Sequence, residues 1–543
     1  MSAIEDQLLK IKHEAEEREA KRKAEAAGLE YLDLNLTPVE TDALKIIPEE
    51  KARALQISPI RLKGHDLEIG IFDPEDPEVQ KLIENLKSKI QNLKSYVVSL
   101  NGLEHAWSFY KYTSSQTASI HNRFDIEKDH IESLFNKLVT FDAVADEIHD
   151  FDFQKSPTGQ ILEIILAGGL ANRASDIHFE PEAIYVKIRY RVDGILHDIV
   201  SDLPTNIYSQ LLNRMKLLAN LKLNLQHEPQ DGRFSLGLIN KEIEIRLSVV
   251  PSEFGETVVM RLLDPDILKI GLKDLGFRAD DLVIIEQELK EPNGMILNSG
   301  PTGSGKTTTL YAFLRAKENP EIKIITIEDP IEYHLEGVEQ TQVESEADST
   351  PNTAGGVGYN FANGLRAIMR QDPDVILIGE IRDKETAEIA IQAALTGHLV
   401  FSTVHANDAV GVVPRLLDLG IKDTSIEPAL NLIIAQRLVR KLCENCKKPA
   451  ELSPELKSKI QNLISSLPSR VDKFQYQEWK IFTAGKCEKC ANTGYKGRIG
   501  IYELLREGVD KLPEVTVQQD GLLKVISGIT TVEEIEAVTG PIK

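Results

Sequence analysis

The chain has 543 residues, which at ~100–200 residues per domain predicts three or four domains, each with its own core. Its composition, 42% hydrophobic and 27% charged, is typical of a water-soluble globular protein. The net charge of −22 disfavours nucleic acid as the main partner, because negative charge repels phosphates. No stretch has the ~18 uninterrupted apolar residues of a membrane span, and the first 30 residues lack a secretory apolar segment. We therefore expect a cytoplasmic protein.

Changes of pattern along the chain predict its domain organisation. Acids and bases alternate at the N-terminus, which indicates a charged, solvated helix. Short apolar runs later alternate with helical stretches, which is typical of an α/β domain with a mainly parallel sheet. The predicted parts are a charged helical N-terminus (1–27), a first N-terminal domain (28–120), a linker (121–155), a second N-terminal α+β domain (156–268), an α/β core (269–440), a cysteine module (441–500) and a C-terminal helical region (501–543).

A phosphate-binding loop is the most specific motif. The run "GPTGSGKTTT" follows a predicted strand and fits the pattern G-x-x-x-x-G-K-[ST]. Glycines let backbone N–H groups turn toward phosphate oxygens, and the following helix adds its positive end. We expect Lys306 to neutralise the β- and γ-phosphates of ATP and the Thr307 hydroxyl to ligate Mg²⁺. The predicted cradle comprises Gly300, Pro301, Thr302, Gly303, Ser304, Gly305, Lys306, Thr307 and Thr308.

Carboxylates follow two other predicted strands. Glu380 comes after the buried run in "DVILIGE", where it could hold the magnesium shell or orient water. Glu328, Asp329 and Glu332 follow the run "IKIIT", and one of them could polarise the attacking water. Spacing does not decide which one, and capping or ion pairing is the alternative role for each.

Two histidines flank a fourth predicted strand, "LVFSTV". His398 precedes it and His405 follows it, so an extended chain separates them by roughly 23 Å. They cannot both contact one phosphate. Because ligands bind at the carboxyl ends of parallel strands, we expect His405 to contact the γ-phosphate and His398 to be structural or at a subunit contact.

Together these segments resemble the secretion-ATPase superfamily, in particular the type II secretion and type IV pilus assembly ATPases. In family terms they look like the Walker A motif, the aspartate box, the Walker B motif and the histidine box, in the family's order. Upstream, "ASDIHFEP", "RYRVDG", "PQDGRFS" and "GETVVMRLLD" resemble the family's second N-terminal domain, and the segment beginning "LKIIPEEK" resembles its first. The resemblance covers roughly residues 28–540 and implies a RecA-like P-loop ATPase domain within 269–440.

The resemblance also implies partners and site residues. It implies a homo-hexamer at the inner face of the cytoplasmic membrane, where ATP turnover rotates an inner-membrane platform protein that extrudes pilin or pseudopilin subunits. Lys306, Thr307, Glu380, His405 and one of Glu328 or Glu332 match catalytic or sensing positions. Four residues match family arginines near the interdomain nucleotide site, with ordinary ion pairs as the alternative. They are Arg191, Arg233, Arg246 and Arg261.

Two segments depart from the family pattern. The loop 344–360 is longer and more polar than expected, which indicates an insertion. The charged helix 1–27 replaces the Arg-Leu-Gly-type opening that is linked to cyclic-di-GMP binding in some relatives. We therefore do not expect this chain to bind cyclic-di-GMP.

Four cysteines form two C-x-x-C pairs in a chain that we expect to be cytoplasmic, which favours metal over disulfides. The pairs are Cys443–Cys446 and Cys487–Cys490. Two such turns complete a tetrahedral Zn²⁺ shell, and four cysteine ligands make the zinc structural. The long gap between the pairs adds only ~0.7 kcal/mol of closure cost, which is small beside the ~10–16 kcal/mol of structural zinc binding.

We therefore expect an ATP-hydrolysing hexameric motor for assembly of a type IV pilus or a type II secretion pseudopilus. A retraction-type motor is the first alternative, but the cysteine module and the first N-terminal domain argue for assembly. A nucleotide-binding regulatory module without hydrolysis is the second, and the set of acids beside Lys306 argues against it. A nucleic-acid motor is disfavoured by the net charge of −22.

Overall fold

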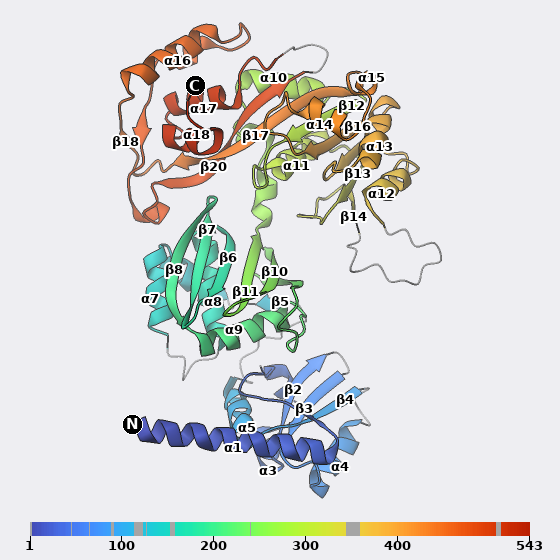
Figure 1. Cartoon of the computed structure of the whole chain (residues 1–543), viewed down its shortest axis with the longest axis vertical. Helices are drawn as coiled ribbons and strands as arrows, with labels where there is room; N and C mark the ends of the chain where they lie inside the picture. Colours follow the sequence, from blue (N-terminus) through green and yellow to red (C-terminus); the bar gives the residue numbers. More distant parts are fainter. Residues whose placement is uncertain are drawn as a thin grey trace. The chain divides into compact units, whose positions relative to one another are not determined.

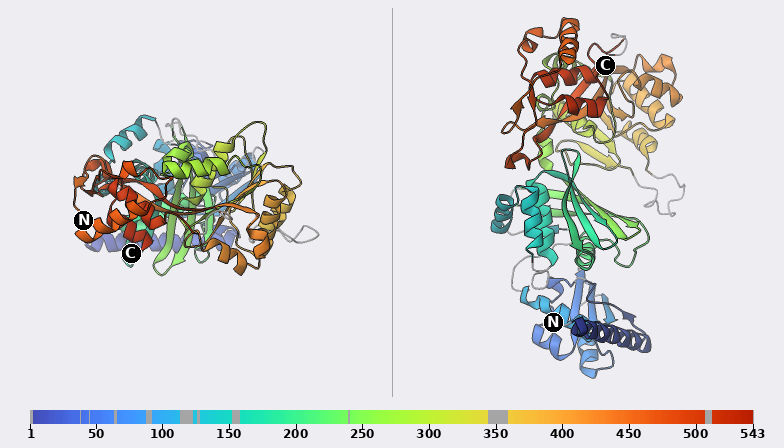
Figure 2. Two further views of the ribbon diagram at one scale, coloured as in Figure 1. Left: turned by 90° about the horizontal axis from the view of Figure 1, so that it is seen from above. Right: turned by 60° about the vertical axis from the view of Figure 1, so that its left-hand side comes forward.

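The computed structural model divides between Leu263 and Asp264 into two compact units (Figures 1 and 2). No helix of the described part of the chain is long and apolar enough to cross a membrane. The predicted insertion 344–360 lies outside the described residues, apart from its last two. The structure describes residues 3–37, 39–44, 46–63, 66–87, 92–112, 123–125, 128–151, 158–238, 241–343, 359–506 and 512–542.

A four-stranded sheet of order β1-β4-β3-β2 forms the core of the first N-terminal segment. Its strands are β1 (Glu30–Tyr31), β2 (Ile57–Lys63), β3 (Asp66–Ile71) and β4 (Asn92–Val97). The helices are α1 (Ala3–Ala27), α2 (Thr41–Leu44), α3 (Glu49–Ala54), α4 (Pro77–Lys87) and α5 (Leu100–Trp107), with a 3₁₀ turn at Ser108–Tyr112. The buried indole of Trp107 donates to the carbonyl of Ile57 at 2.8 Å and ties α5 to β2.

The charged N-terminal helix is docked rather than solvated along its last turns. Ala20 and Ala24 are buried where α1 packs on β1, β4 and α5. The Glu17 carboxylate accepts a hydrogen bond from the Ser99 hydroxyl at 2.6 Å. The expectation of a solvated helix was therefore wrong for this part. Two alanines four residues apart make a narrow apolar stripe, which the surrounding charges hide in the sequence.

A seven-stranded sheet of order β5-β9-β10-β11-β6-β7-β8 forms the rest of this unit. Its strands are β5 (Arg123–Asp125), β6 (Ala174–Pro181), β7 (Tyr185–Val192), β8 (Ile195–Pro204), β9 (Gln230–Gly237), β10 (Glu242–Ser252) and β11 (Gly255–Leu263). Burial alternates along β7, so one face of the sheet packs on the core. The helices α8 (Thr158–Ala171) and α9 (Thr205–Leu218) belong to the same core (Figure 1).

The segment 121–155, predicted as a linker, contributes to that core instead. It forms β5 and the helices α6 (Lys128–Lys137) and α7 (Phe141–His149), which pack on α8. Leu134, Val144 and Ile148 are buried in the cluster. On α7 the acids Asp142 and Asp146 are exposed while Val144 and Ile148 are buried, so the exposed charges of a short amphipathic helix made the segment resemble a connector.

The second unit contains a seven-stranded sheet of order β14-β13-β15-β16-β12-β17-β20. All neighbouring pairs are parallel except β17 and β20. The strands are β12 (Gly294–Ser299), β13 (Ile324–Glu328), β14 (Glu339–Gln342), β15 (Val375–Ile378), β16 (Leu399–Val404), β17 (Leu430–Leu442) and β20 (Tyr495–Leu505). Along β12, Met295 and Leu297 join one buried cluster and Ile296 another, so both faces are covered. The predicted α/β class is confirmed.

Helices cover this sheet, and one long segment departs from it. The covering helices include α10 (Ala279–Glu288), α11 (Lys306–Lys317), α12 (Phe361–Ile368), α13 (Lys384–Leu395), α14 (Val412–Asp418) and α15 (Asp423–Ile426). Between β17 and β20 lie β18 (Lys448–Pro449), α16 (Pro454–Ser466) and β19 (Phe482–Thr483), and after β20 come α17 (Val517–Ile526) and α18 (Val532–Thr539). Short 3₁₀ turns span Pro265–Lys269, Leu272–Asp274, Lys473–Tyr476 and Glu488–Cys490. The predicted boundary at 500/501 thus falls inside β20.

A buried ion network joins α10 to the C-terminal helices. Arg278, with 6% of its side chain exposed, donates to Asp281 at 2.6 Å and to Asp520 at 3.2 Å. Asp520 also accepts from the Tyr502 backbone N–H at 2.8 Å and from the Lys524 ammonium at 2.5 Å. Burial raises the pKa of Asp281 to about 7 against the opposing charge of Arg278. The network therefore fixes α10, β20 and α17 to one another.

We expect Arg278→Ala to lower the free energy of unfolding by about 3–5 kcal/mol, because it leaves the fully buried Asp281 without its nearest cation and removes one of the two cations that contact Asp520. Denaturant unfolding of the full chain measures this loss. Arg498→Ala, at an exposed position on β20, is the matched control and should change stability by no more than about 0.5 kcal/mol. A similar loss in both variants would contradict the role of the network.

Candidate functional site

The loop between β12 and α11 forms a backbone cradle at the carboxyl end of the sheet. Gly303 and Gly305 adopt φ of 78° and 89°, and Gly300 has φ of 151°. A Cβ on Gly300 would lie 2.5 Å from the backbone carbonyl of Gln436 on β17. Only glycine therefore fits at the first position, and α11 begins directly after the loop, with its N–H groups directed at the cradle.

Lys306 closes the cradle with its side chain. Its ammonium group donates to the carbonyl oxygens of Gly300 at 2.8 Å and Pro301 at 3.1 Å. Burial lowers the pKa of Lys306, the carboxylate of Glu380 raises it, and the guanidinium of Arg437 lowers it again. Lys306 is thus a half-buried cation at the loop, as the motif predicts. The next residue, Thr307, is exposed on the first turn of α11.

Glu380 and His405 lie together at the same edge of the sheet. Glu380 follows β15 and His405 follows β16, and these strands are neighbours in a parallel pair. The His405 Nε2 atom is 3.6 Å from a Glu380 carboxylate oxygen. The other oxygen of Glu380 is paired with the Arg382 guanidinium. The Glu380 carboxylate also acts on Lys306 by electrostatic attraction, which opposes the lowering of the Lys306 pKa by burial. The structure therefore brings Lys306, Glu380 and His405 to one edge of the sheet.

Glu328 is turned into the protein rather than toward the open edge. Its buried carboxylate accepts hydrogen bonds from the hydroxyls of Tyr311 and Thr326 and from the Gln340 side-chain amide at 3.1 Å. These donors hold β13 against α11 and β14. The two other acids of this segment are less enclosed, since Asp329 is exposed and Glu332 is half-buried.

His398 lies at the other end of β16. Its imidazole Nδ1 is 3.0 Å from the carbonyl of Ala393, and its own carbonyl accepts from the Gly294 N–H at the start of β12. The amino ends of the strands lie opposite the cradle. The structure therefore separates His398 from the group formed by Lys306, Glu380 and His405.

The four predicted arginines form one row across five strands of the other compact unit. The ladder pairs β9 with β10, β10 with β11, β11 with β6 and β6 with β7 at these positions. The row reads Arg233, Arg246, Arg261, Asp176 and Arg191. Asp176 is 3.0 Å from Arg261 and 3.7 Å from Arg191, so one carboxylate serves two guanidinium groups. Glu244 is 3.9 Å from both Arg233 and Arg246, so all four arginines have an ion-pair partner, which was the alternative role that the sequence left open. Directly opposed residues share a face, and four guanidinium groups against two carboxylates leave the row a cationic stripe.

Sequence reasoning missed two residues of β17 that border the cradle. The buried side-chain oxygen of Gln436 accepts from Asn298 at 2.8 Å and from Thr309 at 2.9 Å, which joins β12 to α11. Arg437 follows it and lies beside Gly300. Only the polar pair Gln-Arg within the apolar run "LNLIIAQRLV" could have indicated them.

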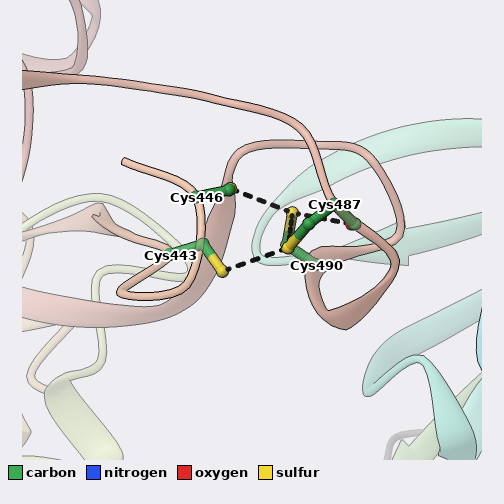
Figure 3. A group of neighbouring side chains, drawn as sticks. All are labelled: Cys443, Cys446, Cys487 and Cys490. Carbon is green, nitrogen blue, oxygen red and sulfur yellow. Dashed lines mark hydrogen bonds between the residues drawn. The ribbon is translucent and has the colours of Figure 1, made fainter. Parts of the chain in front are cut away.

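The four cysteine side chains converge from two turns (Figure 3). All four sulfur atoms lie within 4.8 Å of one another, with three pairs at 3.7–3.8 Å. These separations exclude disulfides, whose sulfur atoms are ~2.05 Å apart. A tetrahedron of sulfurs around a metal at ~2.3 Å has edges of about 3.8 Å. The cluster therefore fits a tetrahedral metal–thiolate site.

Comparisons with known proteins agree with this geometry. A family model described as type II/IV secretion system protein matches residues 153–537, and a MshEN domain model matches residues 27–108. The type IV pilus assembly ATPase PilB of Myxococcus xanthus is 36% identical over 537 residues, 95% of this chain and 89% of that relative. The type II secretion system protein E of Pectobacterium carotovorum is 40% identical over 413 residues, 73% of this chain and 78% of that relative.

Proposed function

Because the chain belongs to the type II/IV secretion system protein family, a family of ATPases, we propose that it hydrolyses ATP with Mg²⁺ as a hexameric assembly motor. One observation carries this proposal: Glu380 and His405 lie together at the sheet edge where Lys306 of the cradle 300–308 is placed. Anion-binding backbone, a cation, a carboxylate and an imidazole at one sheet edge are what phosphoryl transfer requires.

In this mechanism the N–H groups of the cradle and α11 bind the β-phosphate, and Lys306 exchanges its carbonyl partners for phosphate oxygens. The exposed Thr307 hydroxyl would hold Mg²⁺, which when bound neutralises charge on the β- and γ-phosphates. The half-exposed His405 imidazole, 3.6 Å from the Glu380 carboxylate, would donate to the γ-phosphate.

The residue that activates water is proposed to be Glu332 or Asp329 rather than Glu328. Glu328 already accepts three hydrogen bonds from protein donors, so its oxygens have little capacity for a water molecule. Phosphate charge that Lys306 does not neutralise would be met by the arginine stripe of a neighbouring subunit, as the family resemblance implies.

The biological role that we propose is assembly of a type IV pilus or of a type II secretion pseudopilus. The relative that spans 95% of this chain is a type IV pilus assembly ATPase, which supports assembly over retraction. We propose that the motor works in the cytoplasm, docked on an inner-membrane platform protein that moves pilin or pseudopilin. The four-cysteine cluster is proposed to hold one structural zinc.

We expect Lys306→Ala to reduce Mg²⁺-dependent phosphate release by at least about 100-fold, because it removes the cation that meets developing phosphate charge. The full-length chain is assayed by steady-state hydrolysis. Lys290→Ala, at an exposed position of the same unit, is the control and should retain activity. A wild-type protein that binds ATP without releasing phosphate would instead support the non-hydrolysing regulatory module.

We expect about one zinc per chain by elemental analysis, because the four thiolates supply a complete tetrahedral shell. Cys446→Ser should lose the metal and lower the melting temperature, since structural zinc binding is coupled to folding. Glu488→Gln, in the second cysteine turn, is the control and should keep both. The metal assignment would be contradicted if the purified wild-type protein contained no zinc and its melting temperature did not change when a chelator was added.

We expect a sizing measurement with light scattering to give a particle of about six times 60.6 kDa when a non-hydrolysable ATP analogue is present. The reason is that the arginine stripe can meet phosphate charge only across a subunit contact in this proposal. In Lys306→Ala, the ATP analogue should no longer increase the particle mass. A monomer under every nucleotide condition would rule out the hexamer.

A further inference from the structure

Arg437 occupies a place beside the phosphate cradle that no motif explains. It lies on β17, half-buried, and its Nη1 atom is 3.2 Å from the point where a Cβ on Gly300 would stand. The same Nη1 donates to the Gln436 carbonyl at 3.0 Å, and Nη2 donates to the Asn407 carbonyl at 2.5 Å. The guanidinium thus lies between the first residue of the cradle and the segment that follows His405.

Arg437 keeps donors available at this position. A guanidinium has five N–H groups, and its two hydrogen bonds to backbone carbonyls use two of them. Among the described residues, no carboxylate oxygen lies within 4.0 Å of it. Burial lowers the pKa of Arg437, although Asp408 and Glu503 act against this from farther away. A half-buried guanidinium with spare donors and no ion pair is suited to binding an anion.

The position also indicates which part of a nucleotide it faces. The Lys306 ammonium lies on the Gly300 carbonyl, and the lysine of this motif reaches the β- and γ-phosphates. Arg437 lies beside the same glycine and acts electrostatically on Lys306. It is therefore at the β/γ end of the cradle rather than at the end that faces the base.

Arg437 also belongs to the support of the segment 405–411. Arg437 donates to the Asn407 carbonyl of this segment. The buried Glu503 also holds the segment, because its carboxylate accepts hydrogen bonds from the N–H groups of Ala409 at 2.9 Å and of Val517 at 3.2 Å. Glu503 lies on β20 and Val517 begins α17. Hydrogen bonds at Asn407 and Ala409, joined by the backbone between them, thus connect Arg437 through the histidine segment to Glu503 and α17.

We propose that Arg437 binds the γ-phosphate of ATP from within the same subunit and transmits its presence to the segment 405–411. This inference rests on the proposed ATPase function and adds a phosphate-binding residue to it. One or two N–H groups of Arg437 would donate to γ-phosphate oxygens while Nη2 stays on the Asn407 carbonyl. Loss of the γ-phosphate then removes one end of the connection between the cradle and β20.

The test compares the affinities of the full-length variants for a non-hydrolysable ATP analogue and for ADP, both with Mg²⁺, by calorimetry. We expect Arg437→Gln to weaken binding of the ATP analogue at least about tenfold more than binding of ADP, because a charge-assisted hydrogen bond to the γ-phosphate is lost. Arg437→Lys keeps the positive charge and should retain part of the wild-type preference for the ATP analogue over ADP. Arg498→Gln removes the same charge from the exposed part of β20 and should leave the ratio unchanged.

A merely structural role gives a different result. If Arg437 only supports the segment 405–411, then Arg437→Gln weakens both nucleotides by the same factor, and the proposal is overturned. Failure of the proposed function is distinguishable, because Lys306→Ala would then leave binding of both nucleotides and phosphate release at wild-type levels. Thermal unfolding without nucleotide checks that Arg437→Gln is folded. If Arg437→Gln does not fold, Arg437→Lys and Arg437→Met are measured in its place. An affinity ratio of ATP analogue to ADP equal to that of the wild type in both variants would also overturn the proposal.

Discussion

The site depends on one close contact, between the phosphate loop and the neighbouring strand β17. A Cβ on Gly300 would lie 2.5 Å from the backbone carbonyl oxygen of Gln436, and a Cβ on Gly305 would lie 2.8 Å from the side-chain amide nitrogen of Gln436. The side-chain oxygen of Gln436 meanwhile accepts from Asn298 and Thr309 on either side of the loop. The two glycines and this glutamine therefore set the curvature of the cradle, because any side chain on the glycines would push the loop away from the sheet.

Sequence reasoning located residues correctly where they are contiguous in a motif or follow the order of a parallel sheet. The cradle and Lys306 are contiguous, so the motif identifies them before folding is considered. Glu380 and His405 lie 25 positions apart, yet both follow buried apolar runs, and carboxyl ends of parallel strands share one edge. The same logic placed His398 at the opposite end of its strand. The cysteine pairs could be recognised in the sequence in the same way, since each pair forms its own turn.

Prediction failed where a role depends on long-range packing. The segment 121–155 has short helices whose few apolar residues find partners only in the core around α8. Residues 495–500 looked like part of the cysteine module because the chain reaches β20 directly after the second pair, while their strand pairs with β17. Gln436 and Arg437 act through contacts with the loop at 300–309, more than a hundred residues earlier. No local pattern encodes such a contact.

The charges around the cradle support the proposed binding of a highly charged anion. Lys306 and Arg437 are both half-buried and act on each other as like charges, and burial lowers the pKa of each. Glu380 opposes this only partly, because its two oxygens are already engaged with His405 and Arg382. In the proposed function, a triphosphate would relieve the repulsion between these two cations, and a diphosphate would relieve it less. Loss of the γ-phosphate would then change the electrostatics beside the segment 405–411, which Glu503 connects to β20 and α17.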